Sequence, residues 1–273
     1  MITLDTIRKR FGALDVLQDV SLSVRTGAVT ALVGPNGSGK TTLIKIVLGL
    51  TRADHGALHV DGQPADDAGA YRRAIGYMPQ AAHFPANLRV GDVLDLVTQL
   101  RPGEAVDDDL ARAYDMDGIR DKFVGTLSGG TRQKVNAVVA FMFRPALLIL
   151  DEPTAGLDPL AANVLKEKIR AVRREGRSVL ITSHIMTELE SLADDVAFLC
   201  DGRLRFAGPV AELLSHTGGR SLEDAIAGLM RAERAERRAA VAATESVVVP
   251  EPVVSAEPSR PAPWFTPEPK GAA

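Results

Sequence analysis

The chain has 273 residues, 45% of them hydrophobic but only 4% aromatic, so it can bury an aliphatic core as one large domain or two small ones. Its formal net charge of −3 provides no basic surface of the kind that holds nucleic acid. The lone cysteine, Cys200, excludes a disulfide framework and a cysteine-rich metal site, and the apolar residues before it predict a reduced, buried thiol.

A glycine-rich stretch in the N-terminal part lies between a predicted strand and a predicted helix. Alternating apolar residues over 20–24 predict a half-buried strand, and the apolar run 28–33 predicts a buried strand after it. The segment 34–42 then fits the pattern of a glycine, four residues and Gly-Lys-Thr, and the apolar helical face 43–48 follows. This order aims backbone N–H groups and a helix dipole at one point, which attracts phosphate. It indicates a nucleotide-binding P-loop rather than a turn that only caps a helix.

The P-loop pattern assigns roles to individual residues. Lys40 is expected to reach the β- and γ-phosphates, and the hydroxyl of Thr41 to bind Mg²⁺. We expect Gly37 and Gly39 to let the main chain approach the ligand, because a Cβ at either position would crowd it. The predicted nucleotide-binding residues of this loop are Gly34, Pro35, Asn36, Gly37, Ser38, Gly39, Lys40, Thr41 and Thr42.

The next hundred residues change from strand patterns to helical ones. Residues 57–62 indicate a second hairpin, and residues 74–78 a short strand that ends just before Gln80. Apolar residues then recur at helical spacing over 90–100, and residues 84–135 are interpreted as a helical insert in an α/β core. The acidic run 107–109 could be a cation site, but acidic residues in the first turn of a following helix explain it better.

The core resumes with an apolar strand that ends in two carboxylates. Residues 146–150 predict a strand buried on both faces, followed directly by Asp151 and Glu152. In a P-loop protein this is the Walker B arrangement, in which Asp151 holds Mg²⁺ and Glu152 polarises the attacking water as general base. The alternative is an ordinary acidic strand end, which the upstream P-loop makes the weaker interpretation.

The remaining pattern completes a parallel sheet and then leaves it. Asp158 and Pro159 open a helix that runs to Gly176, and strands are predicted over 178–182 and 195–200. The predicted fold is an α/β P-loop NTPase core, a mainly parallel sheet with flanking helices, plus an N-terminal antiparallel β subdomain and the helical insert.

The C-terminal part separates into a helix and a tail. A helical pattern covers 221–244 and is rich in Arg, Ala and Glu from 231 onward, whereas seven prolines over 245–273 predict a disordered tail. Trp264 and Phe265 could form a docking motif, but a solvated end is the preferred interpretation.

A second glycine-rich helix start carries a family resemblance. Residues 127–133 place Ser128, Gly129 and Gly130 before an apolar helix, and this sequence resembles the LSGGQ signature of the ATP-binding cassette family. Alone it could cap an ordinary helix, but the order of motifs over residues 2–230 also agrees. The resemblance implies that Phe11 stacks on adenine and that Gln80 senses Mg²⁺ and contacts a membrane partner. It also implies that residues 155–158, which end in Asp158, form the D-loop, and that His184 contacts the γ-phosphate. The sequence departs from the family pattern in two places. Thr131 stands where the family often has Gln, and residues 138–141, Val-Val-Ala-Phe, stand where many members have Ala-Arg-Ala-Leu.

The resemblance implies a function as well as a fold. ATP and Mg²⁺ would be the cofactors, Lys40, Glu152 and His184 the catalytic residues, and a second copy the partner that completes each ATP site. Membrane-spanning permease subunits of the ABC-2 type would be the other partners, with NosF-type subunits, which serve the copper site of nitrous oxide reductase, the most similar group.

The N-terminus lacks a charged leader and no apolar run could span a membrane, so we expect a cytoplasmic protein, peripheral on the inner face of the cell membrane. The alternative is a soluble, non-transport cassette ATPase that acts on DNA or ribosomes. Such proteins usually carry tandem cassettes or long insertions, and this sequence has one cassette and a short insert. A non-hydrolysing regulator is disfavoured by intact Glu152 and His184.

Overall fold

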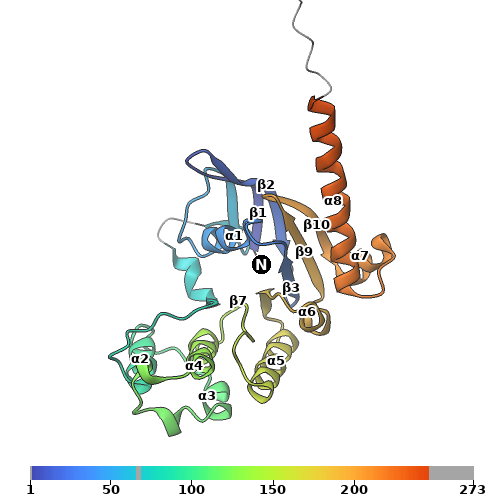
Figure 1. The fold of residues 1–273 in the computed structure, drawn as a ribbon. Coiled ribbons are helices and arrows are strands. Elements are labelled where there is room, and N and C mark those ends of the chain that lie inside the picture. Colours follow the sequence, from blue (N-terminus) through green and yellow to red (C-terminus); the bar gives the residue numbers. More distant parts are fainter. Residues whose placement is uncertain (1, 66–68, 246–273) are drawn as a thin grey trace, which may run out of the picture. The chain divides into compact units, whose positions relative to one another are not determined.

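The computed structural model describes residues 2–65 and 69–245 (Figure 1). The chain forms two compact units, residues 1–231 and residues 232–273, and the described part of the second is the end of helix α8 (Leu222–Glu245). Glu245, expected to begin the tail, still belongs to this helix. The rest of the predicted tail, with Trp264 and Phe265, lies outside the described residues.

The larger sheet has six strands in the order β10-β9-β3-β8-β7-β6, parallel except for β10. Apolar runs form its centre, and every residue of β3 and β8 is buried, as in a sheet covered on both faces. The strands are β3 (Val29–Val33), β6 (Ile75–Met78), β7 (Leu147–Asp151), β8 (Ser178–Thr182), β9 (Asp195–Cys200) and β10 (Arg203–Pro209). The predicted parallel core is confirmed, and β10 is an additional antiparallel edge strand.

The smaller sheet is antiparallel, with the order β2-β1-β4-β5, which confirms the predicted N-terminal β subdomain. Its strands are β1 (Ile2–Phe11), β2 (Leu14–Val24), β4 (His55–Val60) and β5 (Gln63–Pro64). The buried residues of β1 and β2 face the larger sheet, and their charged residues face solvent.

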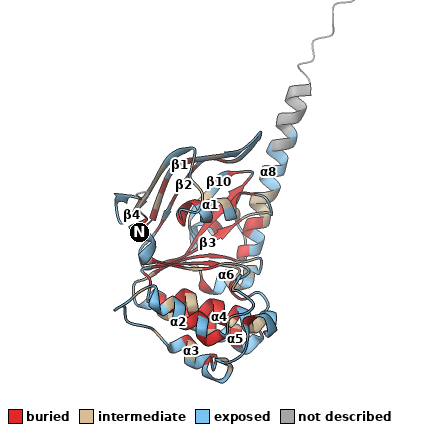
Figure 2. Ribbon diagram, turned by 90° about the vertical axis from the view of Figure 1, so that its left-hand side faces the viewer, coloured by how far each residue is buried: buried red, intermediate tan, exposed pale blue. Residues whose placement is uncertain are grey.

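Two hydrophobic cores lie on opposite faces of the larger sheet (Figure 2). Strand period places Val29, Ala31 and Val33 in one core and Leu32 in the other. Helix α1 and the antiparallel sheet cover the face of Leu32, and the remaining helices supply the other core. The helices are α1 (Lys40–Val47), α2 (Val90–Gln99), α3 (Asp109–Ala113), α4 (Gly129–Phe141), α5 (Pro159–Arg174), α6 (Met186–Leu192), α7 (Val210–Thr217) and α8. The layered arrangement leaves the carboxyl ends of the parallel strands as one shared edge.

The helical segment 84–135 is joined to the core by polar contacts. Asp107 precedes α3, and its carboxylate lies 2.8 and 2.9 Å from Nζ of Lys168 on α5, which also contacts Asp109 at 2.7 Å. The hydroxyl of Tyr114 donates to the carbonyl of Ala161 at 2.9 Å. Asp107 and Asp109 therefore pair with Lys168, and Asp108 pairs with Arg112. Of the three acidic residues, only Asp109 lies within the first turn of α3.

Candidate nucleotide site

The P-loop connects β3 to α1, and protein contacts alone require two of its glycines. A Cβ on Gly34 would lie 2.0 Å from the carbonyl oxygen of Leu199 on β9. Gly39 has φ +105°, and a Cβ there would lie 2.7 Å from Leu17 and 2.9 Å from the carbonyl oxygen of Val16. The missing Cβ of Gly39 therefore makes room for β2, a reason for glycine beside the expected approach to the ligand. At Gly37, with φ +79°, the corresponding space is open.

Lys40 begins α1 and turns its ammonium group toward the loop before it. Its Nζ donates to the carbonyls of Gly34 at 2.7 Å and Pro35 at 3.1 Å. Burial lowers the pKa of Lys40, while the negative charges of Asp151 and Glu152 raise it. Asp151, the last residue of β7, and Glu152, which follows it, therefore lie within electrostatic range of the P-loop lysine.

The other P-loop side chains differ in exposure. Asn36 and Thr41 are exposed and Pro35 and Thr42 half-buried, so the hydroxyl of Thr41 stands at the surface in the first turn of α1. Ser38 is buried, and its hydroxyl has no hydrogen-bond partner within the protein. Thr41 is therefore accessible to a ligand, whereas the Ser38 hydroxyl is enclosed by the protein.

At the carboxyl end of β7, Thr182 of the neighbouring strand holds both acidic residues. Asp151 and Thr182 are register partners in β7 and β8, and the threonine hydroxyl donates to Oδ1 of Asp151 at 2.5 Å. The amide of Glu152 donates to the carbonyl and the hydroxyl of Thr182, both at 3.1 Å. Sequence reasoning missed this role for Thr182, although a polar residue that ends an apolar strand is a usable signal.

Glu152 and His184 form a pair just beyond the sheet. Oε1 of Glu152 lies 2.7 Å from Nε2 of His184, and the His184 side chain is 55% exposed, so it is not a core histidine. The two residues follow adjacent parallel strands, whose carboxyl ends meet at one edge. The structure thus brings Lys40, Asp151, Glu152 and His184 together as a cluster.

The signature loop lies at the N-terminus of α4. Ser128 is the N-cap, and its Oγ accepts from the amide of Thr131 at 3.1 Å and lies 2.8 Å from the Thr131 hydroxyl. Gly129 is exposed, whereas Gly130 packs so closely on Gly156 that a Cβ would lie 2.6 Å from the Gly156 carbonyl oxygen. Thr131, which departs from the family pattern, therefore completes the cap.

Asp158 caps α5, as its position before Pro159 predicted. Its carboxylate accepts from the amide of Ala161 at 2.9 Å and pairs with Lys134 at 3.0 Å. These two hydrogen bonds lower the pKa of Asp158. The D-loop is thereby tied to the helix that carries the signature loop.

Gln80 is exposed just beyond β6 and shares a cavity of about 490 Å³ with the signature loop and the D-loop. The lining includes Gln80, Gly129, Gln133 and Gly156. Residues from three separate motifs thus face one space, which the linear sequence could not reveal.

Phe11 stands apart from that cavity, at the end of β1. It is 52% exposed, pairs across the hairpin with Leu14, and has the ammonium of Lys9 at 5.2 Å from its ring centroid. An exposed aromatic face of this kind can stack on a base. The structure does not bring Phe11 into contact with Glu152 or His184 through any hydrogen bond or ring contact among the described residues.

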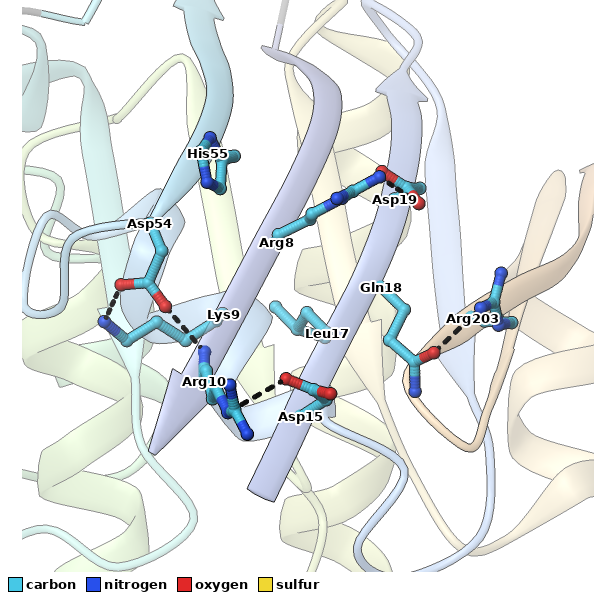
Figure 3. Close-up of a pocket in the computed structure, with 10 residues that line it drawn as sticks. All are labelled: Arg8, Lys9, Arg10, Asp15, Leu17, Gln18, Asp19, Asp54, His55 and Arg203. Atoms are coloured by element: carbon cyan, nitrogen blue, oxygen red, sulfur yellow. Dashed lines mark hydrogen bonds and ion pairs between the residues drawn. The ribbon is translucent and has the colours of Figure 1, made fainter. Parts of the chain in front are cut away.

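A polar groove of about 440 Å³ is lined by residues of β1, β2 and β4 together with Arg203 of β10 (Figure 3). Its cations are already partnered, in the pairs Arg8–Asp19, Lys9–Asp54, Arg10–Asp15 and Arg203–Gln18. Three of the four cations are thus paired with carboxylates, while Arg203 bonds a neutral amide, so most of the positive charge in the groove is already compensated within the protein. Among the described residues no cluster of three or more His, Cys, Asp or Glu side chains could hold a metal ion.

Known proteins match this chain along most of its length. The family model described as ABC transporter matches residues 17–155. A probable ABC transporter ATP-binding protein of Azorhizobium caulinodans is 35% identical over 79% of this chain and 80% of that protein. The lipopolysaccharide export ATP-binding protein LptB of Haemophilus influenzae is 33% identical over 79% of this chain and 93% of its own length.

A solved ATP-binding subunit of an ABC transporter superposes with a TM-score of 0.79 at 30% identity, covering 84% of this chain and 99% of that one. Within the described part of the chain, no helix combines the length and the apolar character needed to cross a bilayer. The motif geometry and the matches agree, and the chain belongs to the ABC transporter family as an ATP-hydrolysing, ATP-binding subunit.

Proposed function

We propose that this chain powers a separate membrane-spanning partner by ATP-driven closure of a dimer of two copies. The observation that carries the proposal is the Glu152–His184 pair, 2.7 Å apart, at the same strand edge as the P-loop lysine. This is the arrangement that hydrolysis of a bound nucleotide needs: charge stabilisation beside a base that is itself oriented.

Each residue of the cluster has a role in the proposed reaction. The N–H groups of residues 34–42 and the ammonium of Lys40 hold the β- and γ-phosphates. Glu152 takes the proton of the attacking water, and His184 orients Glu152 and contacts the γ-phosphate. Phe11 stacks on the adenine.

The oxygen donors at the site fit Mg²⁺. Thr41 offers an exposed hydroxyl, Asp151 a carboxylate and Gln80 an amide oxygen, and hard oxygen ligands are what Mg²⁺ prefers. The ion, when bound, neutralises charge that develops on the phosphate oxygens. In the protein, Thr182 keeps the Asp151 carboxylate oriented through its 2.5 Å hydrogen bond.

Subunits of this family dimerise and work with membrane-spanning permeases. We propose that in this chain Ser128, Gly129 and Gly130 of one copy close over the P-loop of the other, with Asp158 beside them. The exposed Ser128 and Gly129 support this arrangement, because a helix start with free backbone N–H groups binds phosphate. Each chain has one P-loop and one signature loop, so a dimer has two complete sites.

The permease-docking surface that we propose lies between the helical segment and the core sheet. A groove of about 240 Å³ there is lined by apolar residues that include Tyr77, Val97, Leu100 and Phe143. Leu100 is 70% exposed and the neighbouring Leu96 50% exposed, so an apolar element of a partner could bury both. Tyr77 in this groove lies three residues before Gln80. A permease bound there would hold the subunit on the cytoplasmic face of the membrane.

We further propose that the permease is of the ABC-2 type and that the system resembles NosF-type transporters. The proposal rests on the resemblance of residues 84–88 and 127–143 to that group. The test is deletion of the gene in its host: loss of copper from nitrous oxide reductase supports the assignment, and an enzyme with full copper content refutes it.

The transport role is tested by purifying the tagged chain from detergent-solubilised membranes. We expect a stoichiometric polytopic membrane protein to co-purify, and Leu100→Asp to abolish co-purification while the ATPase rate of the chain alone is unchanged. Ribosomal or DNA-repair proteins in place of a membrane protein would instead favour a soluble, non-transport cassette ATPase.

A further inference from the structure

Helix α4 carries two buried amide side chains among apolar neighbours. Gln133 is 5% exposed and Asn136 2% exposed, and the buried face around them includes Val135, Ala137 and Val138. Burying an amide without hydrogen bonds costs free energy that an apolar residue would avoid. Their presence therefore calls for a role that hydrogen bonding explains.

The two amides form a chain of hydrogen bonds between two loops of the nucleotide site. Asn136 Nδ2 donates to the carbonyl of Pro79 at 2.8 Å and to Oε1 of Gln133 at 3.3 Å. Gln133 Nε2 lies 3.4 Å from the carbonyl oxygens of both Glu152 and Pro153. Pro79 directly precedes Gln80, so these hydrogen bonds connect the loop of Gln80 to Glu152, the residue that we assign as general base.

Chemistry fixes the direction of this chain. The carbonyls of Glu152 and Pro153 can only accept, so Gln133 must turn its amino group toward them and its oxygen toward Asn136. Asn136 must then turn its amino group toward Gln133 and toward the third carbonyl, that of Pro79. Neither amide can flip without placing two acceptors against each other.

We propose that Gln133 and Asn136 are positioning residues for ATP hydrolysis. Together they hold the peptide after Glu152 and the peptide before Gln80 at a fixed separation, so that both side chains face the same nucleotide. The inference rests on the roles proposed above for Glu152 and Gln80, and it adds α4 to the parts that set their geometry.

The backbone conformation of Glu152 makes its position sensitive to the loss of neighbouring hydrogen bonds. Its φ is +50°, a left-handed conformation that non-glycine residues seldom adopt and that persists only where the surroundings hold it. Thr182 holds the Glu152 amide from one side, and Gln133 approaches its carbonyl from the other. Loss of the Gln133 contact releases the carbonyl end of Glu152, and the Glu152 carboxylate then turns away from His184.

The same helix has a second connection. Its N-cap, Ser128, is the residue that we place on the nucleotide of the second copy, while Gln133 and Asn136 contact the loops of the helix's own site. Helix α4 is therefore a direct link between the two ATP sites of a closed dimer.

The test compares steady-state ATP hydrolysis by the full chain with that of Gln133→Leu, Asn136→Leu and the double variant. We expect kcat to fall about tenfold in each single variant with KM for ATP within about twofold, because the P-loop is untouched. The double variant should lose no more than either single variant, as residues that act as one unit do. Phe141→Leu, a buried apolar change on the same helix, is the control for lost stability and should keep the wild-type kcat.

Asn136→Asp tests the donor directly and is available if the leucine variants fail to fold. Its carboxyl group can donate to the Pro79 carbonyl only when protonated, so its kcat relative to the wild type should fall as pH rises. Leucine variants with wild-type kcat, additive losses, or an Asn136→Asp rate parallel to the wild type at every pH would overturn the inference. Glu152→Gln separates the proposed active site from the proposed role of Gln133 and Asn136. If this variant hydrolyses ATP at the wild-type rate, the assigned site itself is wrong, and not only the role of the two amides.

Discussion

The ion pair of Lys168 gives the sharpest stability prediction, because it joins the helical segment to the core. The Lys168 side chain is 9% exposed and that of Asp107 8%, with Nζ 2.8 Å from a carboxylate oxygen. Removing one partner of a buried pair leaves an uncompensated charge, which typically costs about 3–5 kcal/mol. Asp109, the second carboxylate, is 61% exposed and can be solvated instead. We therefore expect Lys168→Met to lower the free energy of unfolding by about 3 kcal/mol, the lower end of that range.

Urea unfolding of the wild type, Lys168→Met and Lys168→Met/Asp107→Asn measures this effect. The double variant should recover part of the loss, because the buried charge is gone. Arg112→Met is the matched control: Arg112 pairs with Asp108 and Asp109 at the surface, so its loss should cost less than about 1 kcal/mol. A Lys168→Met variant within about 0.5 kcal/mol of the wild type would refute the reasoning, since surface substitutions stay in that range.

The pH dependence of the same variants has a definite sign. The hydrogen bond and charge of Lys168 lower the pKa of Asp109 in the folded state. A carboxyl group with a lowered folded pKa contributes stability above its unfolded pKa of about 3.9, and this contribution is lost as pH falls through the folded pKa. The stability difference between the wild type and Lys168→Met should therefore shrink below about pH 4.

Two further predictions concern nucleotide binding. Phe11→Ala should raise KM for ATP about tenfold with little change in kcat, because base stacking on an aromatic ring contributes about 1–3 kcal/mol to binding. Phe11→Trp should retain the wild-type KM. Equal KM values for the wild type and both variants would show that Phe11 does not belong to the site. Gly34→Val should abolish ATP binding, measured with a fluorescent ATP analogue, since its Cβ would lie 2.0 Å from the Leu199 carbonyl oxygen; wild-type affinity would contradict the packing described for that loop.

Much of this fold is encoded in local patterns. The buried strands β3, β7 and β8 are apolar runs in the sequence. The P-loop marks the start of α1, and Asp158 with Pro159 marks the start of α5. The sequence places Glu152 and His184 just after the carboxyl ends of two strands of the predicted parallel sheet, while the pairing of β7 with β8, which brings the two residues together, is seen only in the structure. The edge strand β10 was not predicted, although Arg203 to Phe206 alternate between charged and apolar residues as a half-buried strand does.

Contacts between distant elements could not be predicted in the same way. Lys168 is one of several cations on an amphipathic helix, and only the packing of α5 against the segment before α3 shows that it is buried. Gln133 and Asn136 look like polar positions on a helix surface until the loops at Pro79 and Glu152 are placed beside them. Gly39 is a further example, since the need for glycine that β2 imposes there appears only when the two elements are packed together.

Glu152→Gln tests the central claim most directly, because it removes the general base and leaves the shape of the site unchanged. We expect kcat to fall at least about 100-fold, within the range that general base catalysis contributes. With hydrolysis blocked, ATP should hold two copies together, so that size-exclusion chromatography with multi-angle scattering shows a dimer with ATP and a monomer with ADP. A variant that still hydrolyses ATP at the wild-type rate, or that stays monomeric at saturating ATP, would contradict the account.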